Sequence, residues 1–362
     1  MSRVFNFGAG PAMLPESVMK KAQADLLDFK GLGVSVMEVS HRTNEFEELL
    51  DETTQLFREL IKLPGNYRTV FIHGGAQMQF SAVPLNLIGR NAAKKALYFE
   101  TGVFAKQALE EAKRYGEIKI AASSAETGFD RIPAYDPADF DKDASYVHLT
   151  SNNTIVGTQW KTYPKTDDLP LVIDATSDIL SRKVDFSQIG ILFASLQKNL
   201  GPPGVALVAI REDLFGHASP YTPKLLNYEL NAKNNSLINT ANTFAIYMVH
   251  LVLQWLEEQG GVAAIEKHNK KKASCLYEAI DQSGFYQGFA HPDHRSIMNV
   301  PFNLPSEELL EKFLNEALEE GFYALKGHRS VGGVRASIYN PMPMEGVEGL
   351  KSFMEEFERR NG

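Results

Sequence analysis

Strand-like and helix-like segments alternate through the first two thirds of this 362-residue chain. Short apolar runs rich in β-branched residues recur, and helical patterns lie between several of them. Strands separated by helical stretches predict βαβ crossovers, so we expect an α/β fold with a mainly parallel sheet and helices on both faces. In such sheets ligands bind at the carboxyl ends of the strands. The expected strands cover residues 68–73, 96–99, 117–121, 146–150, 171–173, 191–194 and 205–210.

The organisation changes in the last third of the chain. A long helix is expected from Asn239 to about Gln259, and Gly260-Gly261 separates it from a second helix. The pattern that follows predicts a smaller α+β unit. Because 362 residues exceed the usual domain size of roughly 100–200, we predict two domains. The large domain covers 16–265, and the small C-terminal domain combines 1–15 with 266–362. The other elements expected are helices over 15–30, 103–115, 262–281, 306–320 and 346–359, a strand over 297–302 and a Gly-rich strand region over 327–339.

Composition excludes several classes of partner. Acidic residues outnumber basic ones, 45 against 37, whereas a nucleic-acid footprint requires the opposite balance. The most apolar stretch, 243–256, is interrupted by His250 and Gln254 and is too short to cross a bilayer. The single Cys275 has no partner for a disulfide or a zinc site, and the N-terminus does not resemble a signal peptide. We therefore predict a cytoplasmic protein without nucleic-acid, membrane or metal partners.

One lysine stands directly beyond an apolar strand. Lys198 follows the expected strand 191–194 and precedes a Gly- and Pro-rich loop, 201–204. A lysine at a buried strand end is partly desolvated, which lowers its pKa and frees its lone pair to attack a carbonyl. For this motif alone, a lysine in an ordinary polar loop is an equally good interpretation.

An aspartate occupies the corresponding position on another strand. Asp174 ends the expected strand 171–173, 24 residues (198 − 174) before Lys198. A lone Asp at such a place is more often a helix cap or a turn residue. However, the gap matches one βαβ crossover, so both side chains can reach the same end of adjacent strands. Pyridoxal 5'-phosphate needs this pair, a lysine to form its Schiff base and a carboxylate to keep its pyridine nitrogen protonated. The pair predicts a pyridoxal-phosphate site.

A phosphate also needs backbone donors. Residues 72–77 give a strand end, Gly74-Gly75 and then a helix, which is the geometry of an anion site. The motif is neither a GxxxxGK loop nor a GxGxxG turn. Asn239-Thr240, where the long helix is expected to begin, offers further donors, although a simple N-cap explains these residues equally well. A nucleotide-binding or dehydrogenase domain built on Gly74-Gly75 remains the alternative of a different class. It predicts a colourless protein, as opposed to a yellow one whose colour responds to glutamate.

Basic residues form two His-Arg pairs in turn-like contexts. The first is His41-Arg42, the second is His328-Arg329, and Arg335 follows the second pair. A guanidinium binds carboxylate or phosphate through two parallel hydrogen bonds. Exposed loops explain either pair alone, but together they indicate a substrate with two anionic ends.

Several motifs along the whole chain resemble those of the phosphoserine aminotransferases, fold-type-I pyridoxal-phosphate enzymes of the class-V aminotransferases. The resemblance implies the roles of Schiff-base lysine and proton shuttle for Lys198, and of pyridinium partner for Asp174. It places Phe104 against the cofactor ring and Thr154 at its hydroxyl. The motifs are FNFGAGPAMLP (5–15), SVMEVSHR (35–42), QKN (197–199), MNVPF (298–302), LKGHR (325–329) and VGGVRASIYN (331–340). The implied phosphate ligands are Ala76, Gln77 and Gln197, with Asn239 and Thr240 from the second subunit of a homodimer with shared active sites.

The resemblance also implies the reaction. Glutamate gives its amino group to 3-phosphohydroxypyruvate, which yields phosphoserine for serine biosynthesis and 2-oxoglutarate; the same chemistry serves a phosphorylated four-carbon analogue in vitamin B6 synthesis. Arg335 is expected to bind the substrate α-carboxylate. His41, Arg42, His328 and Arg329 are expected to bind the substrate phosphate or the distal carboxylate of glutamate.

Two positions depart from many relatives of that family. Gln77 replaces an arginine, and Ala9 replaces a serine. Related fold-type-I enzymes remain the nearest alternatives, either an alanine–glyoxylate aminotransferase or a cysteine desulfurase. A desulfurase needs a mobile nucleophilic cysteine, whereas Cys275 falls in an expected helix.

Overall fold

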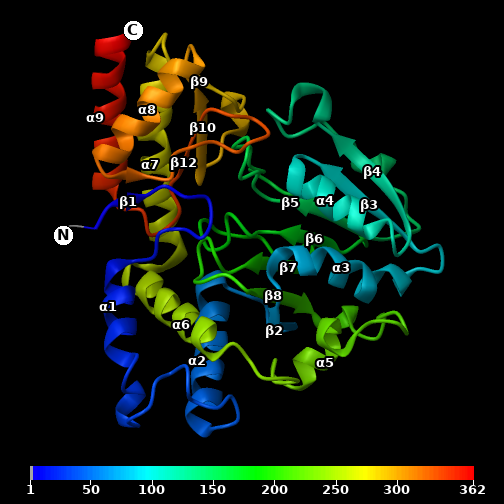
Figure 1. Cartoon of the computed structure of the whole chain (residues 1–362). Helices are drawn as coiled ribbons and strands as arrows, with labels where there is room; N and C mark the ends of the chain where they lie inside the picture. The colour runs from blue at the N-terminus through cyan, green and yellow to red at the C-terminus, as the bar shows by residue number, and fades with distance from the viewer. Residues whose placement is uncertain (1–2) are drawn as a thin grey trace.

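The computed structural model describes residues 3–362, and its largest sheet has seven strands (Figure 1). The strand order is β2-β8-β7-β6-β5-β3-β4. Strand β8 runs antiparallel to both of its neighbours, and the remaining adjacent strands are parallel. This confirms the predicted mainly parallel α/β fold. The strands are β2 (Tyr67–His73), β3 (Lys95–Glu100), β4 (Glu117–Ser123), β5 (Ala144–Thr150), β6 (Leu171–Asp174), β7 (Ile189–Ser195) and β8 (Val205–Arg211).

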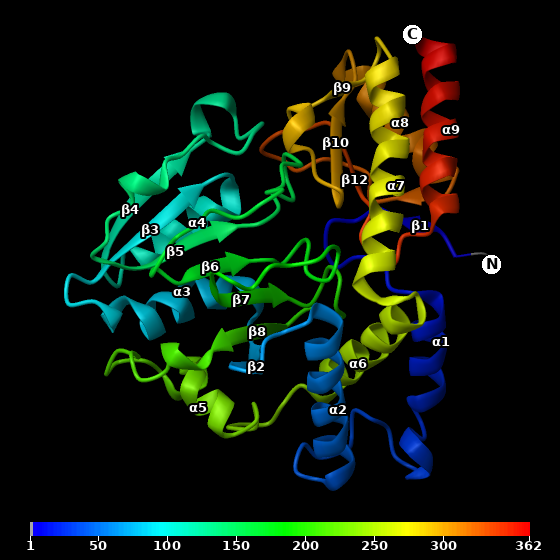
Figure 2. The same cartoon turned by 180° about the vertical axis from the view of Figure 1, so that it is seen from behind.

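The central strands are apolar because both faces of the sheet are covered. Every residue of β5, β6 and β7 is buried. Alternation along β6 sends Val172 into one apolar core and Ile173 into the other. Helices α3 (Gly75–Leu87) and α4 (Val103–Ala112) pack on the Val172 face, and α2 (Asn44–Ile61) and α6 (Thr243–Glu258) pack on the Ile173 face. Figure 2 shows the same layers from behind.

The C-terminal part has its own small sheet and its own core. Strands β9 (Gln287–Gly288), β10 (Asn299–Asn303) and β12 (Val334–Ser337) are antiparallel in the order β12-β10-β9. Phe7 belongs to the core of this C-terminal part, as do residues of α8 (Glu307–Glu319) and α9 (Met344–Asn361). The long helix α7 (Gly261–Gln282) contributes Ile265 to the large core and Leu276 to the small one. The proposed domain boundary near residue 265 remains a prediction.

Some local predictions were wrong. The expected helix 15–30 is shorter, with α1 (Glu16–Asp25) followed by a single 3-10 turn, Phe29–Gly31. The expected strand region 327–339 retains only β12, because Gly332 and Gly333 adopt positive φ angles of 78° and 67° that end the extended backbone. Asn239 and Thr240 do not begin the long helix; Asn242 caps it by accepting a hydrogen bond from the Ala245 N–H at 3.0 Å. The remaining elements are β1 (Phe5–Asn6), which pairs with β11 (Phe322–Tyr323), and α5 (Tyr228–Lys233).

None of the helices within residues 3–362 combines the length and the apolar character that a bilayer crossing requires.

Candidate active site

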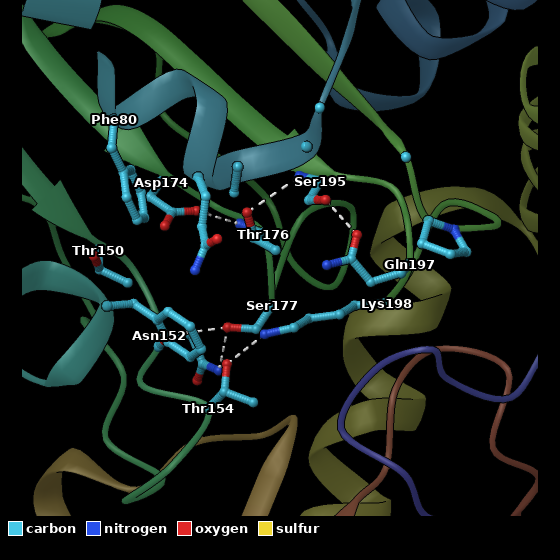
Figure 3. Close-up of a pocket in the computed structure, with 17 residues that line it drawn as sticks. Phe80, Thr150, Asn152, Thr154, Asp174, Thr176, Ser177, Ser195, Gln197 and Lys198 are labelled. Atoms are coloured by element: carbon cyan, nitrogen blue, oxygen red, sulfur yellow. Dashed lines mark hydrogen bonds between the residues drawn. The ribbon is translucent and has the colours of Figure 1, made fainter. Parts of the chain in front are cut away.

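A cavity of about 310 Å³ lies at the carboxyl ends of β5, β6 and β7. Its position is the one that the parallel topology predicts for a ligand. Figure 3 shows side chains from these strand ends converging on it, together with the beginning of α3. Seven of the residues proposed from the sequence line it: Ala76, Gln77, Phe104, Thr154, Asp174, Gln197 and Lys198.

Lys198 is the buried cation of this cavity. Its side chain crosses the cavity toward Thr154 (Figure 3), and its Nζ donates a hydrogen bond to the Thr154 Oγ1 at 2.6 Å. Nζ also lies 5.5 Å from the centre of the Phe104 ring. Burial lowers the pKa of Lys198 to about 8, and although the charge of Asp174 opposes this shift, the charge of Arg335 adds to it. A substantial neutral fraction of this amine is therefore available near physiological pH, as a nucleophile requires.

Asp174 is the buried anion of the same cavity. Its Oδ1 accepts a hydrogen bond from the Thr176 N–H at 3.0 Å. Thr176 is itself fixed, because its Oγ1 accepts a hydrogen bond from the Ser195 N–H at the end of β7 at 3.1 Å. Burial raises the pKa of Asp174, while the hydrogen bonds from Thr176 and the charge of Lys198 oppose that shift. A carboxylate has about four lone-pair sites, so Asp174 can accept a further N–H donor from a ligand.

The first turn of α3 forms an anion cradle beside this pair. Gly74 and Gly75 have positive φ angles of 99° and 69°, and the N-cap Gly74 has no side chain to satisfy the first helical N–H groups. A Cβ atom on Gly75 would lie 2.7 Å from the Ser195 Oγ, so the close approach here requires glycine. The Gln77 side chain donates to Gln107 on α4 at 3.4 Å, and the N–H groups of this uncapped first turn are suited to an anion.

These residues fit pyridoxal 5'-phosphate. One cavity provides an amine for its aldehyde, a carboxylate for its ring nitrogen and an aromatic face at Phe104. The Oγ1 of Thr150, which also lines the cavity, is buried without a hydrogen-bond partner among the described residues. The uncapped helix start suits the phosphate.

Arg335 belongs to the smaller sheet and does not itself line the cavity. It is on β12, where it pairs with Pro301 of β10. Burial lowers the pKa of Arg335, and its charge acts on Lys198. Burial, followed by the charges of Arg335 and Arg329, lowers the pKa of His328, which places these basic groups near one another. The charges of Arg335 and Arg329 thus both act on His328.

The structure does not bring every proposed residue into the cavity. Seven of them do not line it: His41, Arg42, Asn239, Thr240, His328, Arg329 and Arg335. Arg42 is exposed just before α2, and the Thr240 carbonyl lies 3.1 Å from the Nε2 of His73, outside the cavity. The roles of all the proposed site residues, including those that line the cavity, remain predictions.

Several lining residues were not proposed from the sequence. They are Phe80, Thr150, Asn152, Thr176, Ser177, Ser195, Pro203 and Gly204. Thr150 and Ser195 end strands, and Asn152, Thr176 and Ser177 follow strand ends by two or three residues. The rule that ligands bind at strand ends contained this signal, but it does not say which of these polar residues point inward.

Comparison with known proteins agrees with this geometry. The model of the family described as aminotransferase class-V matches residues 4–350. A phosphoserine aminotransferase of Bacillus cereus is 50% identical over 361 residues, with 100% of both chains covered. The chain belongs to the phosphoserine aminotransferase family. A relative of the same name from Geobacillus kaustophilus is 51% identical and covers 99% of both chains. The predictions of the family, of an aminotransferase and of its pyridoxal 5'-phosphate cofactor are thus confirmed.

Solved structures give the same result. Phosphoserine aminotransferase from Bacillus circulans subsp. alkalophilus superposes with a TM-score of 0.96 at 46% identity, covering 99% of each chain. The pyridoxal-phosphate-bound phosphoserine aminotransferase from Trichomonas vaginalis gives 0.93 at 37% identity, covering 98% of this chain and 100% of that one. The alanine–glyoxylate aminotransferase from Nostoc sp., at 18% identity and a TM-score of 0.75, shares the fold alone.

Proposed function

We propose that this chain transfers the amino group of glutamate to 3-phosphohydroxypyruvate, producing phosphoserine and 2-oxoglutarate in serine biosynthesis. The observation that carries this proposal is the buried pair of Lys198 and Asp174 in one cavity, in a chain that matches phosphoserine aminotransferases over its full length. A cytoplasmic location suits these substrates and the single, partly buried Cys275.

Each residue of the cavity has a distinct task in this reaction. Bound pyridoxal 5'-phosphate supplies an electron-accepting ring for the carbanion at the substrate Cα. Lys198 removes the proton from Cα of glutamate, and in the second half-reaction it delivers a proton to Cα of phosphoserine. Its lowered pKa suits both steps. Asp174 holds a proton at the pyridine nitrogen, and Phe104 packs against the ring. The N–H groups of Ala76 and Gln77 at the start of α3, with Gln197, bind the phosphate of the cofactor.

The basic residues select the substrate. Arg335 binds the α-carboxylate, which all four substrates and products share. Glutamate and phosphoserine both carry a distal anion, so the same basic groups at His328 and Arg329 serve both. A phosphorylated four-carbon analogue of the vitamin B6 pathway presents the same two anionic ends and fits the same proposal.

A homodimer completes the proposed site. Arg42 follows a loop on which Leu32, Val34 and Met37 are 44%, 40% and 57% exposed. Such a cluster of exposed apolar side chains is typical of a surface covered by a partner. We propose that this loop packs on a second copy, so that His41 and Arg42, together with Asn239 and Thr240, reach the partner's cavity.

A complementation experiment tests this arrangement. Subunits carrying Lys198→Ala or Arg42→Ala are expected to be impaired alone, but mixed dimers contain one site with both residues intact. Random mixing should restore about a quarter of the wild-type phosphoserine activity, because half of the dimers are mixed and each has one intact site. If mixing restores nothing although differently tagged subunits co-purify as mixed dimers, Arg42 acts within its own subunit or not at all.

The half-reaction with glutamate tests the function itself. We expect the purified protein to be yellow, and its visible absorbance band to disappear when glutamate is added and to return with 3-phosphohydroxypyruvate. Phosphoserine is expected to discharge the band at a concentration at least about tenfold lower than alanine, because alanine lacks the distal anion. Equal responses to alanine and phosphoserine would remove the proposed substrate class, and a band insensitive to glutamate would contradict the transamination.

A further inference from the structure

Lys272 is a second buried lysine, outside the cavity. It lies on α7 and is 0% exposed. Its Nζ donates hydrogen bonds to the carbonyl oxygens of Ile338 at 3.0 Å, Tyr339 at 2.7 Å and Met342 at 3.0 Å. A lysine ammonium has three donors, so this one side chain uses all of them on a single five-residue segment of backbone, 338–342.

Burying a lysine ammonium costs free energy of folding. Its presence here therefore needs an explanation other than stability. Burial lowers the pKa of Lys272 to about 7, and among residues 3–362 no carboxylate offsets that effect. Apolar side chains often replace buried charged groups without loss of stability. Stability alone therefore does not explain an ammonium at this place, whereas holding several carbonyls in one geometry does.

The segment that Lys272 holds connects two parts of the active site. It begins directly after β12, the strand of Arg335. At its centre, the Asn340 N–H donates to the Asn199 Oδ1 at 3.0 Å, and Asn199 is the neighbour of Lys198 in the sequence. The Tyr339 hydroxyl donates to the Ala9 carbonyl at 3.0 Å. Segment 338–342 is thus fixed to the large domain beside Lys198 and to the strand that carries Arg335.

We infer that Lys272 is a positioning residue, which sets the placement of Arg335 relative to Lys198 and thereby the affinity for the substrate α-carboxylate. Without its three hydrogen bonds the carbonyls of the segment lose their partner, and the segment can shift to find others. Lys272 itself does not touch substrate or cofactor. The inference rests on the proposed role of Arg335.

The test compares Lys272→Met with Arg335→Ala and with the double variant. We expect Lys272→Met to raise the apparent dissociation constant of glutamate in the half-reaction about tenfold, since small misplacements of binding groups have effects of this order. The rate at saturating glutamate and the absorbance of the bound cofactor should change less than about threefold. In the Arg335→Ala background, Lys272→Met should have no further effect on glutamate affinity. Lys272 is proposed to act only by positioning Arg335, and that side chain is absent from this background.

A matched variant separates positioning from stability. Leu276→Ala removes a fully buried side chain one turn farther along α7 and should lower the midpoint of thermal unfolding without changing glutamate affinity. Lys272→Gln keeps two donors, so a smaller loss of affinity is expected, and it gives the same comparison if the Met variant does not fold.

The outcomes distinguish the two proposals. If Arg335→Ala weakens glutamate binding but Lys272→Met and Lys272→Gln do not, or if the effects in the double variant add, the inference about Lys272 is overturned and the role of Arg335 stands. If Arg335→Ala leaves glutamate affinity unchanged, both fail. Equal loss of affinity in Leu276→Ala would assign the effect of Lys272 to stability.

Discussion

Lys198→Ala should lower kcat by at least about four orders of magnitude. Among residues 3–362, Lys198 is the one amine that lines the cavity, and in the proposed mechanism it serves both as the attachment point of the cofactor and as the proton carrier. Acid–base transfer alone contributes roughly 10²–10⁴-fold, and the loss of covalent attachment adds to it. The fold should persist, because removing a buried ammonium relieves a desolvation cost. Turnover is measured with glutamate and 3-phosphohydroxypyruvate, and visible absorbance reports attachment.

The exposed Lys142 provides a matched control for this variant. Lys142→Ala removes the same group from the surface and should leave both turnover and absorbance unchanged. Transamination by Lys198→Ala above the rate of free pyridoxal 5'-phosphate would show that another group carries the proton and would reassign the nucleophile.

Asp174→Asn should lower kcat on the order of 10²–10³-fold, the size observed when one electrostatic partner of a developing charge is removed. The amide keeps the shape of the carboxylate but loses the charge that we propose to stabilise a protonated pyridine nitrogen. Because Lys198 is still present, the protein should remain yellow. Absorbance and kcat therefore respond separately in this variant, whereas both are lost in Lys198→Ala.

Asp143→Asn, at an exposed position in the turn before β5, is the corresponding control. It should leave kcat unchanged. If Asp174→Asn turns over at nearly the wild-type rate, the buried carboxylate does not support the ring nitrogen. If the variant instead loses its colour, Asp174 acts mainly in cofactor binding.

The main features of the site could be predicted because they follow from chain order. Lys198 and Asp174 both stand at strand ends, and parallel strands bring such ends together. The hydrogen bonds of Thr176 could not be predicted, because they depend on the position of Ser195 on the neighbouring strand in space. The antiparallel direction of β8 could not be predicted either, because a strand buried on both faces has the same apolar pattern in either direction.

Local backbone geometry limited the remaining predictions. The loop before β12 has a strand-like composition. However, two glycines with positive φ directly before β12 interrupt the extended backbone, so the strand begins only after them. Helix α2 was not predicted, although Phe46, Leu50 and Phe57 lie at helical spacing and are fully buried. Its apolar face became evident only through its packing against α6, because propensity and pattern alone are weak guides without a partner surface.

Helix α7 affects how the protein unfolds. Because its first turns belong to one core and its later turns to the other, a fragment ending near residue 265 would stop after little more than one turn of this 22-residue helix. If either part unfolds, apolar residues of α7 become exposed, and α7 also packs in the core of the other part. We therefore expect both parts to unfold in a single cooperative thermal transition, even though their sheets are separate.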